Sequence, residues 1–289
     1  MLVFQNKIGK GYVLASTYLC IAVTLLIFLI LFWNSYPALS TVGFDLFTMT
    51  WNPAKDQFGV LSMLFGTLAV TAIALLIAVP LGILTAIFTS EILPNRYRLY
   101  VKSAIELLAG IPSIIYGLIG IALVSPWIAT LFELSSGRTL VTAGILLAVM
   151  ILPTIITLTD DALHNIPQQY RETSKGLGLY PFEIIQKTLV PIAKRNIAGA
   201  VLLALGRALG ETMAVMLLVG SIDKIPEPFY NLLSPGQTIT SKLGREVGES
   251  AFGSLHFSAL NAIGFLLLLL VITLTIGTQV YMRKGIRTV

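Results

Sequence analysis

The sequence predicts an all-α integral membrane protein with six transmembrane helices. Apolar residues make up 56% of its 289 residues and charged residues only 11%, whereas about a quarter of the residues in a soluble domain are charged. The mean hydropathy of +0.86 points the same way. Six apolar runs approach or exceed the roughly 20 residues of helix that a bilayer requires. These spans must be helical because lipid offers backbone amides and carbonyls no hydrogen-bond partner.

The six predicted spans follow one another with only short connections. They cover residues 12–33, 61–89, 99–123, 140–158, 196–219 and 257–281, and the longer connections are 34–60, 125–139, 160–195 and 220–256. The first apolar run is too long for a signal-peptide core and lacks a small-residue cleavage site, so we expect it to remain as an anchor. We therefore predict an N-terminal anchor helix with its following loop, residues 1–60, and a transmembrane core, residues 61–289.

Proline and glycine interrupt two of the predicted spans. Pro80 lies in the second span, and Gly110 and Pro112 lie in the third. Proline removes a backbone donor and clashes with the preceding turn, so we expect bends at these positions, with a moving hinge as the alternative. At the start of the third span, Lys102 and Glu106 are four residues apart and share one helical face. Because Glu106 lies only a turn or two inside the cytoplasmic edge, we expect it either to pair with Lys102 or to extend to the membrane surface, with substrate contact as the alternative.

The basic residues predict the orientation of the spans. Of the 19 lysines and arginines, Arg207 lies in a span and five lie in loops on one side: Lys55, Arg138, Lys224, Lys242 and Arg245. The remaining 13 flank the other side: Lys7, Lys10, Arg96, Arg98, Lys102, Arg171, Lys175, Lys187, Lys194, Arg195, Arg283, Lys284 and Arg287. Since basic residues concentrate on the cytoplasmic side, we expect both termini in the cytoplasm. The basic balance therefore reflects topology, and a nucleic-acid partner has no support.

The chain shows no pattern of an enzyme or a metal protein. Cys20 is a single thiol within the first span, and His164 and His256 fall on opposite sides of the membrane, so we expect no metal site. Neither an H-E-x-x-H motif nor a nucleophilic serine motif occurs. A phosphate loop of the form G-x4-G-K-[ST] is also missing, so this chain is not expected to bind or hydrolyse ATP. We predict no catalytic residue and no cofactor of its own.

Between residues 160 and 195 the chain is polar and is predicted to fold into two short helices. Pro167 is suited to open the first, and Gly176 or Gly178 to end it in a left-handed cap. Pro181 then begins the second, whose apolar residues recur at helical spacing on one face: Phe182, Ile185, Leu189 and Ile192. Two helices with a glycine corner form a rigid knob, which transmits force better than a flexible loop.

The same connection carries a spaced motif. Glu172-Thr173-Ser174 precedes Gly178, and Pro191 follows the glycine by thirteen residues. This resembles the E-A-A-x3-G-x9-I-x-L-P loop of bacterial ABC importer permeases, with Thr173 and Ser174 in place of the two alanines. The alternative is a solvated amphipathic loop with a chance match. The resemblance implies a surface that docks onto a cytoplasmic ATPase and includes Arg171, Glu172, Thr173, Ser174, Gly178 and Pro191.

The fifth predicted span holds two charged residues. Arg207 falls at the midpoint of residues 196–219, with Glu211 one turn later, and a central arginine costs roughly 2.5–3.5 kcal/mol on insertion scales. The helix must therefore face protein or water. Because residues four apart share a face, the two side chains either form a structural ion pair or line a cavity. In a cavity the guanidinium suits bidentate binding of an oxyanion such as phosphate, with Glu211 and Thr212 beside it on a substrate pathway.

A second resemblance covers nearly the whole chain. Gly206-Arg207-Ala208-Leu209-Gly210-Glu211-Thr212-Met213-Ala214 resembles the fifth span of phosphate importer permeases of the PstC type, and residues 51–53, 105–113 and 237–240 agree with the same type. The resemblance implies the six-helix bundle of type I (MetI-like) ABC importer permeases in a bacterial or archaeal inner membrane. It implies a permease subunit that moves phosphate by alternating access. Its partners would be a PstA-like second permease, two PstB-like ATPases carrying ATP and Mg²⁺, and an external PstS-like phosphate-binding protein.

Three alternatives remain open from the sequence. Arg207 alone would suit a permease for another oxyanion, such as molybdate or sulfate. A channel or an ion-coupled secondary transporter would work without a docking loop or an ATPase. The outer loops around 51–59 and 237–249 either contact the binding protein or pack at the rim of the bundle.

Overall fold

The computed structural model describes residues 2–284, and side chains from 9 to 280 apart from Asn95. Within this range six helical runs are long and apolar enough to cross a membrane: Gly9–Thr41, Leu61–Ile92, Ser113–Leu131, Leu140–His164, Pro181–Gly210 and Leu255–Val280. The prediction of a six-span all-α membrane protein is confirmed. The chain ends, and the side chains of Lys7, Arg283, Lys284 and Arg287 used in the orientation prediction, lie outside the described part.

The centre of the bundle is the contact between α2 (Leu61–Ile87) and α6 (Leu140–His164). On α2, small residues recur every four positions, at Ala74, Ala78, Gly82 and Ala86, and all four are buried. A Cβ on Gly82 would lie 2.7 Å from the Cγ2 atom of Ile155. Small side chains let two membrane helices approach closely. Such close packing is what holds them together, because lipid supplies no hydrophobic force between helices. The helix α9 (Val190–Gly210) packs on the same α6.

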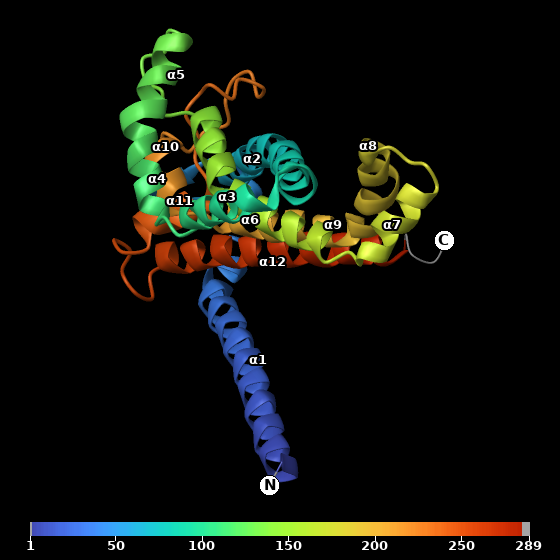
Figure 1. Ribbon diagram of the computed structural model, residues 1–289. Coiled ribbons are helices and arrows are strands. Elements are labelled where there is room, and N and C mark those ends of the chain that lie inside the picture. The colour runs from blue at the N-terminus through green and yellow to red at the C-terminus, as the bar shows by residue number, and fades with distance from the viewer. Residues whose placement is uncertain (1, 285–289) are drawn as a thin grey trace.

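The first helix, α1 (Leu2–Thr41), projects away from the bundle and packs mainly against α12 (Leu255–Lys284), as Figure 1 shows. Phe28 and Phe32 contact Phe265 edge-on, with ring centroids 5.3 and 5.7 Å apart. The helix continues beyond the predicted span, to Thr41. It is followed by the 3₁₀ turn η1 (Gly43–Phe47) and by a hairpin of β1 (Trp51–Asn52) and β2 (Gln57–Phe58), with η2 (Pro53–Lys55) between the strands.

The third span differs from its prediction. Residues 99–123 do not form one helix. After the π-helical turn η3 (Phe88–Ile92), α3 (Asn95–Ala109) ends before Pro112, whose ψ of 137° turns the chain, and a new run begins with α4 (Ser113–Ile119). This run continues through η4 (Gly120–Val124) and α5 (Ser125–Leu131), so part of the predicted outer turn 125–139 is helical. Proline cannot donate to the preceding turn, which separates the two helices completely where only a bend was expected.

The fifth span is also broken. The predicted helix 196–219 ends at Gly210 with α9, and α10 (Met213–Leu218) starts after two non-helical residues. At its other end, α8 (Pro181–Ile184) passes through the π-helical turn η5 (Ile185–Leu189) into α9. The wider turn shifts the register, so the buried face is Ile184, Leu189, Ala193 and Ile197. Phe182 and Ile192 of the predicted face are exposed.

Two ends of the bundle are distinguished by their short helices. In Figure 1, α7 (Gln168–Gly176) and α8 lie near the C-terminal end of α12, while α10 and α11 (Ile239–Glu246) lie towards the opposite end. We call these the α7 end and the α11 end. At the α11 end Lys242, 4% exposed, pairs with Asp223 and with Glu246, and its amine lies 5.1 Å from the ring of Trp51. This cluster ties the hairpin to α11 and to the loop after α10.

Candidate functional site

The polar connection at the α7 end folds as two short helices with a glycine corner. Pro167 directly precedes α7, and Gly178 follows it with a φ of +80°. The Gly178 amide donates to the Lys175 carbonyl at 2.9 Å. A Cβ at this glycine would meet nothing within 4 Å, so the left-handed backbone alone favours glycine here. The predicted left-handed cap is confirmed at Gly178.

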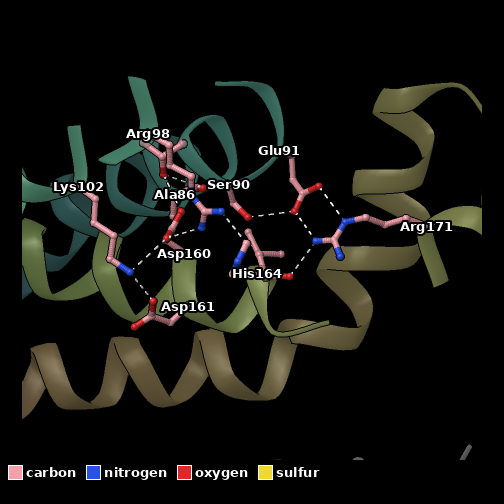
Figure 2. A network of polar contacts seen from close by, with 11 residues as sticks. Ala86, Ser90, Glu91, Arg98, Lys102, Asp160, Asp161, His164 and Arg171 are labelled. Atoms are coloured by element: carbon pink, nitrogen blue, oxygen red, sulfur yellow. Dashed lines mark hydrogen bonds and ion pairs between the residues drawn. The ribbon is translucent and has the colours of Figure 1, made fainter. Parts of the chain in front are cut away.

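Arg171 holds α7 to the bundle and faces inward (Figure 2). Its guanidinium makes a two-pronged contact with Glu91 of η3, Nη2 to Oε1 at 2.7 Å and Nε to Oε2 at 3.2 Å. It also donates to the carbonyls of Ile166 at 2.8 Å and Leu163 at 2.9 Å. The Leu163 carbonyl is in the last turn of α6, and the Ile166 carbonyl lies two residues beyond that helix. One side chain therefore links α7 to the ends of α2 and α6, an intramolecular role that the sequence did not indicate.

Of the other predicted docking residues, Ser174 is also internal. It is buried, and its hydroxyl lies 3.0 Å from that of Thr188 in η5. Glu172, Thr173, Gly178 and Pro191 are exposed. Large side chains that the motif does not include are exposed around them: Tyr170, Leu177, Tyr180 and Phe182. Their signal in the sequence was aromatic and apolar residues within a polar loop. The α7 end thus offers a mixed apolar and polar surface on a braced scaffold.

A second set of ionic contacts braces the same end of the bundle (Figure 2). Asp160 of α6 is 3% exposed and accepts hydrogen bonds from Thr89 at 3.0 Å and Arg98 at 2.9 Å. Lys102 of α3 binds Asp161 at 2.7 Å, so the predicted pairing with a glutamate on its own helix is wrong. That hydrogen bond raises the pKa of Lys102 above its ordinary value, although partial burial opposes the shift. α3, α6 and the end of α2 are thereby tied together.

The break in the fifth span places Arg207 and Glu211 in different surroundings. Arg207 lies in the last turn of α9, is exposed, and lines a hollow of about 680 Å³ with Thr154, Thr275 and Gln279. Glu211 is extended, and its Oε1 accepts the Ala214 amide at 3.2 Å. Across the described residues no ion pair joins the two. Of the two alternatives, the structural ion pair is not formed, because the i,i+4 helical geometry ends at Gly210.

Thr212 lies inside the break, between α9 and α10. A Cβ on Gly244 of α11 would lie 2.8 Å from its Cγ2 atom, and Thr240 of α11 donates to the Glu211 carbonyl at 2.7 Å. Through its bond to the Ala214 amide, the carboxylate of Glu211 caps the N-terminus of α10, where helix N–H groups lack intrahelical partners.

Among the described residues no cluster of three or more His, Cys, Asp and Glu side chains is arranged to bind a metal ion.

Comparison with known proteins assigns the chain to a family. Residues 78–288 match the profile described as "Binding-protein-dependent transport system inner membrane component". The chain belongs to this family. The match begins within α2, so the predicted division after residue 60 stays a prediction. The family is one of transport permeases. In this chain the six-span bundle carries both the break after Gly210 and the braced α7 surface.

Relatives and solved structures of this permease family agree with that assignment. "Phosphate transport system permease protein PstC" of Mesorhizobium japonicum is 39% identical over 279 residues, covering 89% of this chain and 84% of that protein. "Probable ABC transporter permease protein YqgH" of Bacillus subtilis is 38% identical, covering 77% and 72%. The MetNI methionine ABC transporter matches in fold with a TM-score of 0.58 at 20% identity, over 78% of this chain and 94% of that one. The fold is therefore the MetI-type ABC importer permease bundle.

Proposed function

We propose that this chain is a permease subunit of an ATP-driven importer of inorganic phosphate, and that it forms the translocation pathway by alternating access. The observation that carries the proposal is Arg207, which lines a hollow beside a helix break with no carboxylate paired to it among the described residues. An intramembrane guanidinium facing a hollow is suited to an oxyanion. The PstC name of the 39% identical relative favours phosphate over molybdate or sulfate.

The α7 surface is proposed to dock onto an ATPase subunit. Arg171 braces α7 against two membrane helices, and Glu172 and Thr173 are exposed on it. A movement of α7 would therefore be transmitted to the ends of α2 and α6, because these contacts join them rigidly and no flexible loop lies between. We expect two PstB-like ATPases to bind ATP and Mg²⁺ and to hydrolyse ATP, a PstA-like chain to complete the pathway, and an external PstS-like protein to deliver phosphate.

The proposed orientation places both termini and the α7 end in the cytoplasm, with the α11 end outside. It rests on the unequal distribution of basic residues between the two sides. Labelling Thr173→Cys in intact bacterial or archaeal cells tests it. A membrane-impermeant reagent should react only after the membrane is opened, and labelling from outside would contradict the orientation.

Uptake by the complete complex tests the function. Proteoliposomes containing both permeases and the ATPases, with binding protein outside, should accumulate labelled phosphate only when ATP is inside. Excess sulfate or molybdate should compete little. If either anion is imported in place of phosphate, the substrate assignment is wrong. Uptake driven by an ion gradient without ATP would instead favour a secondary transporter.

A further inference from the structure

A hollow at the α11 end is lined by two arginines. Its volume is about 450 Å³, and its lining residues are Arg138, Met216, Leu217, Gly220, Ser221 and Arg245. Arg138 comes from the connection before α6 and Arg245 from α11, so a loop and a helix far apart in sequence supply the two cations. No acidic residue lines the hollow. On the proposed orientation it opens on the outer side of the membrane.

Of the three other basic residues predicted on that side, two are paired with carboxylates, and the third, Lys55, is exposed and does not line this hollow. Lys242 is buried and paired with Asp223 and Glu246. Lys224 pairs with Glu227 at 3.4 Å. Within residues 9–280, neither lining arginine belongs to an ion pair. Two guanidinium groups in one hollow repel each other, and an anion between them would relieve the repulsion.

The backbone of this hollow is held in place by contacts around Gly220. This residue has a φ of +88° and would carry a Cβ 2.8 Å from the Arg138 carbonyl oxygen. Gly220 also bridges to Gly236, whose amide donates to the Val219 carbonyl at 2.8 Å. Ser221 follows with a φ of +59° and is itself one of the lining residues. The turn therefore packs directly on the segment that carries the first arginine.

The hollow lies one short helix away from the proposed substrate pathway. Met216 and Leu217 line it from α10, and that helix, at 1.5 Å per residue over six residues, is about 9 Å long. The other end of α10 follows Thr212, which lies in the break after α9, the helix that carries Arg207. Gly244, which packs on Thr212, directly precedes Arg245. The hollow and the break are thus joined through both α10 and α11.

We propose that Arg138 and Arg245 form an entry site for the phosphate oxyanion, which holds the substrate before it reaches Arg207. The proposal rests on the proposed function and names a second position for the same substrate. Guanidinium groups donate in a planar fork that matches the oxygens of a phosphate, and the hydroxyl of Ser221 supplies a further donor. An anion released at the outer mouth would be held there until it moves inward along α10.

Transport by the whole complex tests this site. Arg138→Gln, Arg245→Gln and the double variant are compared with Lys224→Gln, which removes an exposed outer cation that does not line the hollow. Loss of a hydrogen bond to a charged group corresponds to roughly a ten- to hundredfold change in binding. The double variant should therefore import at least about tenfold less phosphate per ATP hydrolysed, with Lys224→Gln near wild type. The binding-protein concentration giving half-maximal ATPase activity should not change.

The other outcomes overturn the proposal in different ways. If that half-maximal concentration rises and the phosphate imported per ATP stays constant, the arginines contact acidic groups of the binding protein. A deficit that appears only in vesicles containing phosphatidylglycerol would mean that a lipid headgroup occupies the hollow. Wild-type transport by the double variant would refute the entry site without contradicting the proposed function. If the wild-type complex imports sulfate but no phosphate, the proposed function fails, and the same variants measured with sulfate decide the site.

Discussion

Replacing Arg171 by alanine should loosen α7 from the bundle. The change removes a two-pronged contact with Glu91 and two hydrogen bonds to carbonyls. The two charged side chains are 15% and 11% exposed, so the carboxylate would lose its cation in a largely water-excluded place. Breaking a buried pair on one side costs about 3–5 kcal/mol, and the residual exposure favours the lower end of this range. A loss of about 3 kcal/mol corresponds to roughly a hundredfold change in a local opening equilibrium.

Hydrogen exchange of the purified complex without nucleotide measures this opening. Amides of α7 should lose up to about a hundredfold in protection, while amides in the middle of α6 stay unchanged. ATP-driven uptake should fall further than ATPase activity, since a loose α7 would move without moving α2. The matched control is Lys187→Ala, which breaks an exposed i,i+4 pair with Glu183 in the same region and should cost only about 0.5 kcal/mol or less. Equal protection of α7 in both variants would refute the bracing role.

The remaining predictions concern one residue or pair each. Gly178→Val should destabilise the corner by about 1–2 kcal/mol, because valine is strained in the left-handed backbone there, and should reduce phosphate uptake by protein that still inserts. The control Gly176→Ala, inside α7, should transport normally. Equal uptake by the two variants would contradict the role of Gly178 in the corner. Arg207→Gln should abolish phosphate uptake at equal membrane abundance, and adding Glu211→Gln should not restore it, because the two are unpaired; rescue would assign Arg207 a structural role. Burial raises the pKa of Glu246, but hydrogen bonds from its neighbours outweigh this and hold it below the ordinary 4.5. The ionised Glu246 carboxylate therefore stabilises the fold above pH 4.5, and this stabilisation is lost as the pH falls through the lowered pKa. Fluorescence of Trp51, which donates a hydrogen bond to Glu246, should change over this pH range in wild type but not in Glu246→Gln.

Several features of the fold were predictable because they depend on short stretches of chain. Apolar length decides whether a helix spans a membrane, so the six spans could be found from hydropathy alone. The left-handed position at Gly178 and the helix start after Pro167 follow from backbone sterics of single residues. The exposed Glu172 and Thr173 follow from the polarity of their own loop.

The exact ends of the spans depend on interactions that a periodic pattern does not record. The break before Pro112 was expected only as a bend, because the cost of an unsatisfied carbonyl depends on which neighbours can satisfy it. The break after Gly210 could not be predicted in the same way, because no proline lies near it in the sequence. There Glu211 caps α10 and Thr240 of another helix binds the Glu211 carbonyl. The π-helical turn η5 likewise moved the buried face from Phe182 to Ile184.

From its sequence alone this protein could be assigned its fold class, its number of spans, and the residue types suited to an oxyanion and to a docking loop. Only the tertiary structure decided which side chains meet. It turned Arg171 inward onto Glu91, separated Arg207 from Glu211, and brought Arg138 and Arg245 into the lining of one hollow. The physical reason is that hydropathy and backbone sterics act on neighbouring residues, whereas ion pairs and hollows depend on the packing of helices whose positions no local pattern specifies.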